Sequence, residues 1–342
     1  MKNIMNYSVN GYCLEWHLRM SNAFNECLVN PIKNLGLDII LQSWDGSKIT
    51  DEDKSNLGKK PIIFCQLPPS EEILSKSFSK LIWIPMVDHI YSANQRWWNN
   101  LPKTIRIIAY SDFVYKRALT ADLQVIRVKY YPNPNQFQQS NFNQPLTALY
   151  WNRRGLFSPR LIENICERLN IQRLFFLSKT DPFISKNLSI FFPNKIGKTT
   201  VEEIPDFLPS SDYLKILQKT NVFLAPRAFE GVGMSFLEAM ASGIVVLAYN
   251  SPTMNEYINH KINGYLLSDS TKNFYQNIVR KIKKKVLRYS ESNYILNKTI
   301  KIDDLNQLDL KNIGYRALSD TFVGYENWKN QLIEIKNFIT DW

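Results

Sequence analysis

Two glutamates eight positions apart, Glu230 and Glu238, stand in the segment RAFEGVGMSFLEAMASG. In the apolar stretch from Gly231 to Asn255, Glu238 is the only charged side chain. An unpaired buried carboxylate is costly, so a carboxylate in such a segment needs a partner or a ligand. Because a carboxylate accepts hydrogen bonds from paired hydroxyls, the chemistry that these residues indicate is the binding of a polyhydroxylated ligand.

The elements that must position the two glutamates are a strand, a loop and a helix. NVFLAP predicts a strand ending near Pro226, RAFEGVG a loop, and MSFLEAMA a helix that Gly243 stops before the strand IVVLAY. Such a loop lies at the carboxyl edge of a parallel sheet, where open α/β sheets bind ligands. Gly231 and Gly233 let the backbone come close, and the helix N-terminus offers free N–H groups to an anion such as a pyrophosphate.

The helical spacing separates the expected tasks of the two carboxylates. Met234, Leu237, Glu238 and Ala241 stand at i, i+3, i+4 and i+7, which predicts that Glu238 lies inside an apolar stripe and meets the hydroxyls of a ribose. Glu230, in the loop, is expected to point into a cleft and meet sugar hydroxyls. The structural alternative is a solvated helix glutamate and a loop glutamate that caps the helix. The two glycines and the apolar surroundings favour the ligand-binding interpretation.

Short apolar runs recur along the chain and are separated by segments of helical length. Such runs are typical of parallel strands buried on both faces, and their alternation with helices predicts an α/β fold. The runs are KPIIFCQL, KLIWIPMV, IRIIAYS, LTALYW, RLFFLS, NVFLAP and IVVLAY.

The length of 342 residues predicts two domains, because single cores usually stop growing below this size. We expect a first domain over residues 1–135 and a linker over residues 136–145, which are rich in Asn and Gln and carry no charge. A second domain is expected over residues 146–320. Residues 321–342 contain apolar residues at helical spacing, so we expect a helix that packs back on the first domain.

Composition limits the compartment and the partners. The chain has no apolar run of about 18 residues and no apolar segment near its start that resembles a secretion signal, so we expect a cytoplasmic protein. Four widely spaced cysteines without zinc-ligand spacing are typical of buried thiols in a reducing compartment. The net charge of +11 favours anionic partners, namely nucleotides, phospholipid surfaces or nucleic acid.

A basic amphipathic stretch runs from Arg280 to Arg288. Such a stretch is usually a solvated helix face. The alternative is attraction to an anionic membrane surface, where each clustered basic residue contributes about 1 kcal/mol. That alternative would suit an acceptor held in a membrane and would place the protein at the inner face of the membrane.

The segment from Arg227 to Leu267 resembles the donor-site region of retaining glycosyltransferases of the GT-B fold, of the family 4 type. The resemblance implies two Rossmann-like domains facing a cleft, a nucleotide-sugar donor held mainly by the second domain, an acceptor held mainly by the first, and a C-terminal helix crossing back to the first domain. The residues that carry it are Pro226, Glu230, Gly231, Gly233, Glu238, Ala239, Met240, Gly243, Glu256, Asn263 and Gly264.

The resemblance assigns roles to the residues of this motif. Glu230 is similar to the glutamate that contacts the hydroxyls of the donor sugar, and Glu238 to the one that binds the ribose of the nucleotide. The backbone N–H groups that would lie near the sugar and the diphosphate are those of Gly231, Val232, Gly233 and Met234.

In this family a basic pair after the first strand of the second domain stabilises the leaving diphosphate. Here the strand LTALYW is followed by Arg153 and Arg154, and either side chain can donate planar hydrogen bonds to phosphate oxygens. The family's usual lysine has no direct counterpart, and Arg160 is the nearest candidate. The structural alternative is an ordinary surface arginine pair.

In the first domain, the segment LIWIPMVDHIY is expected to end a strand with Asp88 and His89, and family members often place a histidine at such an edge, near the donor sugar. The structural alternative is a polar strand end with a capping aspartate. The family's glycine-rich loop after the first strand is reduced here to Asn10 and Gly11, which we take as a candidate substrate contact.

These interpretations predict a metal-independent, retaining glycosyltransferase without a cofactor. It would transfer a hexose from a UDP- or GDP-sugar to a glycan or lipid-linked glycan, in bacterial surface polysaccharide assembly, and we expect no nucleic-acid partner. Two enzymatic alternatives stay open, a nucleotide-sugar epimerase of the same fold and a DNA glucosyltransferase. A glycan-binding protein on an inactive transferase fold is the non-enzymatic alternative.

Overall fold

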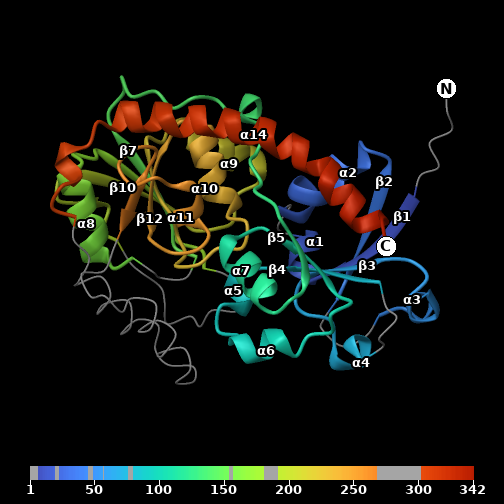
Figure 1. The fold of residues 1–342 in the computed structure, drawn as a ribbon. Coiled ribbons are helices and arrows are strands. Elements are labelled where there is room, and N and C mark those ends of the chain that lie inside the picture. The colour runs from blue at the N-terminus through green and yellow to red at the C-terminus, as the bar shows by residue number, and fades with distance from the viewer. Residues whose placement is uncertain are drawn as a thin grey trace, which may run out of the picture. The chain divides into compact units, whose positions relative to one another are not determined.

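The computed structural model describes most of the chain, namely residues 7–19, 23–44, 49–56, 58–75, 80–153, 157–180, 192–267 and 302–342 (Figure 1). The described chain divides into two compact units. The first unit consists of Met1–Pro132, Phe229–Met234 and Val323–Trp342, and the second of Asn133–Ala228 and Ser235–Phe322.

The first unit is built on a six-stranded sheet in the order β2-β1-β3-β4-β5-β6, and every neighbouring pair is parallel. Its strands are β1 (Tyr7–Cys13), β2 (Leu37–Ser43), β3 (Ile62–Gln66), β4 (Leu81–Pro85), β5 (Arg106–Ala109) and β6 (Gln124–Arg127). All residues of β3 and β4 are buried, as expected for central parallel strands. Between the strands lie α1 (Glu15–Arg19), the π-helix Asn25–Val29, α2 (Asn30–Lys33), α3 (Asp51–Asn56), α4 (Glu71–Leu74), α5 (Val87–Ile90), α6 (Gln95–Asn99) and α7 (Asp112–Thr120).

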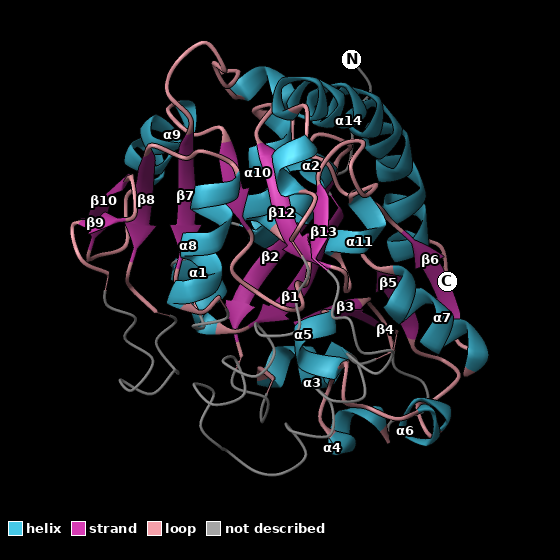
Figure 2. Cartoon of the chain, turned by 90° about the vertical axis from the view of Figure 1, so that its left-hand side faces the viewer, coloured by secondary structure: helices cyan, strands magenta, loops and turns pink. Residues whose placement is uncertain are grey.

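The second unit is built on a seven-stranded sheet in the order β13-β12-β11-β7-β8-β10-β9, whose strands run side by side in Figure 2. Only the β9–β10 pair is antiparallel. The strands are β7 (Thr147–Trp151), β8 (Arg173–Leu177), β9 (Lys195–Ile196), β10 (Thr199–Ile204), β11 (Val222–Leu224), β12 (Val245–Tyr249) and β13 (Tyr265–Leu267). The helices are α8 (Pro159–Arg168), α9 (Ser210–Gln218), α10 (Met234–Ala241) and α11 (Met254–Tyr257), with 3₁₀ turns at Pro134–Gln136 and Leu305–Gln307.

All seven apolar runs predicted as strands are strands of these two sheets, so the α/β prediction is confirmed. They supply the central strands of both sheets, because parallel strands covered on both faces need continuous apolar runs. Their core in the second unit is dominated by Leu, Ile, Val and aromatic side chains.

The last helix, α14 (Leu310–Thr340), is continuous over 31 residues and is drawn in red in Figure 1. Its residues up to Phe322 belong to the second unit and its remaining residues to the first. In the first unit Trp328 is 2% exposed, and its ring lies 5.3 Å from that of Tyr130 and 6.3 Å from that of Tyr110. The predicted return of the C-terminal helix to the first domain is therefore confirmed. None of the described helices combines the length and the apolar character needed to cross a bilayer.

Candidate functional site

The topology of the second sheet marks one position where a ligand is expected. The chain adds β8 on one side of β7 and later returns to add β11 on the other side, so β7 and β11 form a topological switch point. Open parallel sheets bind ligands at the carboxyl ends of the strands that flank such a point. Arg153 stands two residues beyond the end of β7, and α10 is the helix that follows β11.

Helix α10 has the limits that the sequence predicted. It spans Met234–Ala241, and Gly243 follows at φ +69°, a backbone conformation that other residues rarely adopt. The Gly243 N–H donates to the Met240 carbonyl at 3.0 Å, and the Ile244 N–H donates to the Ala239 carbonyl at 2.9 Å. This pair of bonds is the Schellman pattern, which satisfies carbonyls at the end of a helix. The predicted helix and its glycine stop are confirmed.

Glu238 is partly buried and lies on the least covered side of α10. Six of the eight residues of α10 are buried, and the other two, Met234 and Glu238, which lie one turn apart, are partly buried. The helix is apolar on almost every side, so the spacing of four residues could not show which face stays uncovered. Glu238 lies on that uncovered face, where a carboxylate keeps water contact and can meet a ligand.

Arg153 is held at the end of β7 by the strand and by an aromatic ring. The Asn152 N–H donates to the Leu177 carbonyl at 2.7 Å, which extends the β7–β8 pairing past the last strand residue. The Arg153 guanidinium lies 4.9 Å from the ring centre of Trp151, and the Trp151 indole N–H donates to the Lys179 carbonyl at 3.1 Å. A guanidinium stacked on a fixed indole is attracted to its face and is oriented by it.

The other two predicted phosphate ligands differ in what the structure shows. Arg154 lies outside the described residues. Arg160 is exposed in the first turn of α8, where the Ser158 hydroxyl caps the helix by accepting from the Leu161 N–H at 3.2 Å. The basic stretch from Arg280 to Arg288 also lies outside the described residues.

Tyr213 of α9 lies near both charged residues of this edge. Burial raises the pKa of the Tyr213 phenol well above its usual value, the Glu238 charge raises it further, and the Arg153 charge lowers it. Arg153 and Tyr213 meet at the Trp151 indole, because the guanidinium lies 4.9 Å and the Tyr213 ring 6.3 Å from the centre of that ring. Glu238 acts on the phenol of this corner through its charge. Two further aromatic side chains line the corner. We call Trp151, Arg153, Phe207, Tyr213 and Glu238 the Tyr213 corner.

The sequence did not identify the three aromatic residues of the Tyr213 corner. Trp151 ends β7, Phe207 lies between β10 and α9, and Tyr213 lies within α9. They come from separate segments, and no spacing rule connects them. Only the strand order, which brings the carboxyl ends of β7 and β10 to one edge, places them together.

The loop that carries Glu230 belongs to the first unit. The Phe229 ring stacks on Tyr91 with centroids 4.6 Å apart, and a Cβ atom at Gly231 would lie 2.9 Å from the Met86 sulfur. Gly231 is therefore required for close packing against the segment that follows β4. Glu230 itself is 4% exposed. The structure places Val232 in the same loop, buried, and Gly233 at its end with φ +78°.

Asp88 and His89 follow the strand β4 rather than ending it, because the strand stops at Pro85 and both residues lie in the single turn of α5. The His89 Nε2 atom is 3.9 Å from the Asp88 carboxylate, whose side chain is 8% exposed. Met86, directly before this turn, contacts the Glu230 loop. The first unit therefore brings the segments of Asp88, His89 and Glu230 together, although they are far apart in the sequence.

Gly11 does not lie in a loop after the first strand. It is inside β1, and a Cβ atom there would lie 2.7 Å from the Leu41 side chain of the neighbouring strand β2. The close packing of β1 against β2 thus explains why position 11 is a glycine. The switch point of the first sheet is the β1–β3 boundary, and there the sequence missed Gln66, the last residue of β3. Gln66 is 4% exposed with φ 68°, and its side-chain oxygen has no hydrogen-bond partner within the described ranges.

Several polar groups outside this edge have structural tasks. Asp304 pairs with Lys261 and accepts from the Tyr265 hydroxyl, and Arg168 pairs with Asp303 at 2.9 Å. His260 accepts from the Leu266 N–H at 3.1 Å. Across the part of the chain that the structure describes, no three His, Cys, Asp or Glu side chains form a group that could hold a metal ion.

The four cysteines are buried thiols, as predicted, and none forms a disulfide. Burial raises the pKa of Cys13 to about 11 and that of Cys27 and Cys166 to about 12, and it also raises the pKa of Cys65 well above its usual value. Thiols with such values are hardly ionised at neutral pH and are poor nucleophiles.

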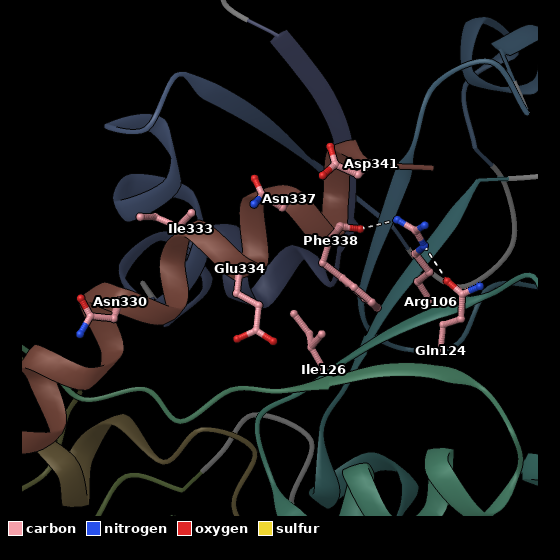
Figure 3. A pocket seen from close by; sticks show the side chains of 9 residues that line it. All are labelled: Arg106, Gln124, Ile126, Asn330, Ile333, Glu334, Asn337, Phe338 and Asp341. Atoms are coloured by element: carbon pink, nitrogen blue, oxygen red, sulfur yellow. Dashed lines mark hydrogen bonds between the residues drawn. The ribbon is translucent and has the colours of Figure 1, made fainter.

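A pocket in the first unit lies at the opposite edge of its sheet (Figure 3). It is lined by Arg106 and Gln124, the first residues of β5 and β6, and by the end of α14. The Arg106 guanidinium donates to Gln124 at 3.0 Å and to the Phe338 carbonyl at 2.8 Å, and it lies 4.0 Å from the Trp342 ring. Its donors therefore fasten α14 to the sheet, and the pocket lies at the amino ends of the strands, away from the switch point.

Comparisons with known proteins agree with this geometry. Residues 201–298 match the family model described as "Glycosyl transferases group 1". An uncharacterized glycosyltransferase of Haemophilus influenzae is 31% identical over 68 residues, and this match spans 19% of each chain. The predicted resemblance to group 1 glycosyltransferases is thus confirmed for the segment that carries α10.

Solved structures resemble the chain over nearly its whole length. A glycosyltransferase from Rickettsia africae has a TM-score of 0.59 at 13% identity, covering 98% of both chains. HepE from Anabaena in complex with UDP-glucose has a TM-score of 0.58 at 10% identity, covering 96% of this chain and 98% of that one. WaaG, a glycosyltransferase involved in lipopolysaccharide biosynthesis, has a TM-score of 0.55 at 13% identity, covering 98% and 100%. The predicted GT-B fold is confirmed.

Proposed function

We propose that this protein is a glycosyltransferase that moves a hexose from a nucleoside diphosphate sugar to a glycan acceptor, with retention of the anomeric configuration. The observation that carries the proposal is the placement of Arg153 and Glu238 beyond the ends of the neighbouring strands β7 and β11. An arginine suits a diphosphate, and a carboxylate suits the paired hydroxyls of a ribose. The match of residues 201–298 to group 1 glycosyltransferases supports this assignment.

In the proposed reaction the bond between the anomeric carbon and the diphosphate oxygen breaks, and its electron pair leaves with the diphosphate. The acceptor oxygen bonds to the anomeric carbon, and the acceptor proton passes to the released diphosphate. Arg153 and the N-terminus of α10 stabilise the developing negative charge. Glu230 contacts the hydroxyls of the donor sugar.

We further propose that the reaction needs no divalent metal, because a guanidinium and a helix N-terminus take the place of the cation at the diphosphate. Initial rates with and without EDTA check this directly. Loss of activity with EDTA and recovery with manganese or magnesium would refute this part of the proposal.

The acceptor is proposed to bind at the carboxyl edge of the first sheet. The buried Gln66 oxygen at the β1–β3 switch point and the α5 turn with Asp88 and His89 supply polar groups there. A glycan or a lipid-linked glycan offers the hydroxyls that such groups bind. A role in surface polysaccharide assembly is supported by the description of WaaG, which belongs to lipopolysaccharide biosynthesis.

The proposal is tested by screening nucleotide sugars for a rise in the unfolding temperature. A ligand at 100 times its Kd stabilises the folded protein by about 2.7 kcal/mol. The donor found in this way is then incubated with and without glycan acceptors. Sugar transfer only in the presence of an acceptor supports a transferase, and donor conversion without an acceptor indicates an epimerase. If no nucleotide or nucleotide sugar stabilises the protein, the proposed function is wrong.

A further inference from the structure

The Tyr213 hydroxyl is a buried polar group that the described chain leaves without a hydrogen bond. Tyr213 as a whole keeps part of its surface exposed, but its hydroxyl oxygen is covered. A buried hydroxyl without a partner is destabilising, and most buried polar groups in folded proteins are paired. Such an oxygen in a candidate site therefore points to a bond that a ligand completes.

The surroundings of this hydroxyl restrict the kind of ligand. The Tyr213 ring lies 6.3 Å from the Trp151 ring at 51°, and the Phe207 ring lies 6.1 Å from the same indole at 72°. The Arg153 guanidinium stacks on that indole as well, at 4.9 Å. The Arg153 guanidinium, the Phe207 ring and the Tyr213 ring, whose hydroxyl is unpaired, therefore all lie around the Trp151 indole within the second unit.

The protonation state of the hydroxyl follows from its neighbours. Burial raises the pKa of Tyr213 well above its usual value, and the Glu238 charge acts in the same direction against the smaller opposing effect of Arg153. The phenol therefore stays neutral at physiological pH, where it can donate one hydrogen bond and accept others.

Each part of a nucleoside diphosphate has a different requirement in this corner. The diphosphate needs the cation of Arg153, and the ribose hydroxyls need the carboxylate of Glu238. An aromatic wall with a neutral hydroxyl carries no charge that could pair with the diphosphate. It instead matches the nucleobase, which is flat and has polar groups at its edge, together with the attached ribose. The Arg153 guanidinium stacks on the indole that the Tyr213 ring also faces, so Tyr213 lies beside the proposed diphosphate position.

We infer that the Tyr213 hydroxyl hydrogen-bonds the nucleoside part of the donor, with Trp151 and Phe207 forming the apolar wall beside it. The inference rests on the proposed function and makes it specific, because none of these three residues belongs to the motif that predicted the donor site. It makes Tyr213 a binding residue for the nucleotide rather than for the transferred sugar.

The test compares the full-length protein with the Tyr213→Phe variant, which keeps the ring and removes only the hydroxyl oxygen. Calorimetric titrations use UDP, GDP, the matching nucleotide sugar and inorganic pyrophosphate. We expect affinity for the nucleotide and for the nucleotide sugar to fall by the same factor, about 3- to 10-fold, the effect of one neutral hydrogen bond. Affinity for pyrophosphate should stay unchanged.

A stability measurement distinguishes this role from a packing role. Because the hydroxyl lacks a partner without a ligand, Tyr213→Phe should leave the unfolding temperature of the ligand-free protein unchanged or raise it. Tyr315→Phe is the matched control, since Tyr315 belongs to the same unit and is 69% exposed. It should change neither affinity nor stability.

Three results would overturn the inference. Unchanged nucleotide affinity in Tyr213→Phe would make the residue a packing residue. An equal loss for nucleotide and pyrophosphate would place the hydroxyl on the diphosphate. A wild-type protein that binds no nucleotide at all would overturn the proposed function together with this inference, whereas the first two results leave the proposed function intact.

Discussion

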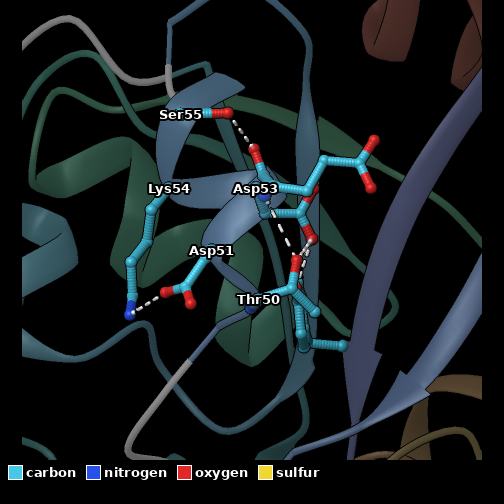
Figure 4. Close-up of polar contacts among 7 residues, drawn as sticks. Thr50, Asp51, Asp53, Lys54 and Ser55 are labelled. Carbon is cyan, nitrogen blue, oxygen red and sulfur yellow. Dashed lines mark hydrogen bonds and ion pairs between the residues drawn. The ribbon is translucent and has the colours of Figure 1, made fainter.

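Two buried polar groups, one in each unit, differ in whether the chain completes their hydrogen bonds. In the first unit the Asp53 carboxylate accepts from the Asn10 amide at 2.8 Å, from the Thr50 hydroxyl at 3.0 Å and from the Tyr12 hydroxyl; Figure 4 shows the part of this cluster around Thr50 and Asp53. In the second unit the Tyr213 hydroxyl has no partner within the described ranges. The first group is complete without a ligand and the second is not, so we assign the first to holding the fold and propose the second as a ligand-binding group.

The Asp53 cluster joins α3 to β1. The Thr50 N–H donates to the Tyr12 hydroxyl at 3.1 Å, and the Asp53 N–H donates to the Thr50 hydroxyl at 3.1 Å, which caps the helix. Burial and the hydrogen bond to Asp53 raise the pKa of Tyr12. Asp53 is 3% exposed and accepts hydrogen bonds from three side chains, so the protein itself supplies the partners of this buried carboxyl group.

The largest expected effect is the loss of this cluster. Asp53→Ala should lower the free energy of unfolding by about 3 kcal/mol, because it leaves buried donors without an acceptor. Urea denaturation measures the change. Asp51→Ala, in the same helix but with a 97% exposed side chain, should change stability by about 0.5 kcal/mol or less. If Asp53→Ala is as stable as wild type but binds nucleotide or acceptor less tightly, the cluster belongs to a binding site and the comparison fails.

The next effect concerns the charged part of the Tyr213 corner. Arg153→Ala should reduce turnover by about 100-fold, because one preorganised donor to the leaving diphosphate is lost. Stability should change little, since Arg153 is only partly buried. Steady-state rates with saturating donor measure the loss. Arg168→Ala, which removes a surface ion pair with Asp303, serves as the control with near wild-type turnover. Equal rates for the two variants would contradict the assignment of Arg153.

The smallest expected effect sharpens the comparison with a second tyrosine of the same unit. The Tyr265 hydroxyl donates to Asp304, whereas that of Tyr213 has no described partner. Tyr265→Phe should therefore lower the free energy of unfolding by about 1 kcal/mol at neutral pH. Thermal or urea unfolding of Tyr265→Phe beside wild type measures it. A Tyr265→Phe protein as stable as wild type would show that hydrogen-bond completeness does not decide the stability of these hydroxyls.

The same contact predicts a pH dependence. The hydrogen bonds from Lys261 and then from Tyr265 lower the pKa of Asp304 below its usual 3.8. A lowered pKa in the folded state stabilises the protein above the unfolded value, and this stabilisation is lost as the pH falls through the folded value. The stability difference between wild type and Asp304→Asn should therefore be constant near neutral pH and should shrink progressively as the pH falls below about 4. A difference that stays constant in acid would contradict the role of the Asp304 charge.

The sequence predicted the parts of the fold that depend on local patterns. Continuous apolar runs identified the central strands, and Gly243 identified the end of α10, because each feature is set by a few adjacent residues. The strand β10 was missed since Thr199–Ile204 alternates polar and apolar residues and has a short antiparallel partner on one side. The strand β1, which contains Asn10 and Gly11, was also read as part of a loop.

The candidate site was predictable only where a motif existed. Glu230 and Glu238 were proposed as site residues from their spacing and the resemblance, and Arg153 from the resemblance. Tyr213 and Gln66 were not, because burial and missing hydrogen bonds are properties of the folded chain. The open side of α10 was not predictable for the same reason, since a helix that is apolar on almost all sides does not reveal from its sequence which side stays open.

The most direct test of a donor nucleotide at the carboxyl edge of the second sheet is calorimetric titration of wild type and Glu238→Ala with UDP and GDP. The account predicts that wild type binds one of them and that Glu238→Ala binds it about 10- to 100-fold more weakly, because hydrogen bonds to a charged group are lost. The unfolding temperature of the variant should stay close to wild type, and Glu203→Ala, an exposed residue of β10, should bind normally. A folded Glu238→Ala protein with wild-type nucleotide affinity would contradict the account.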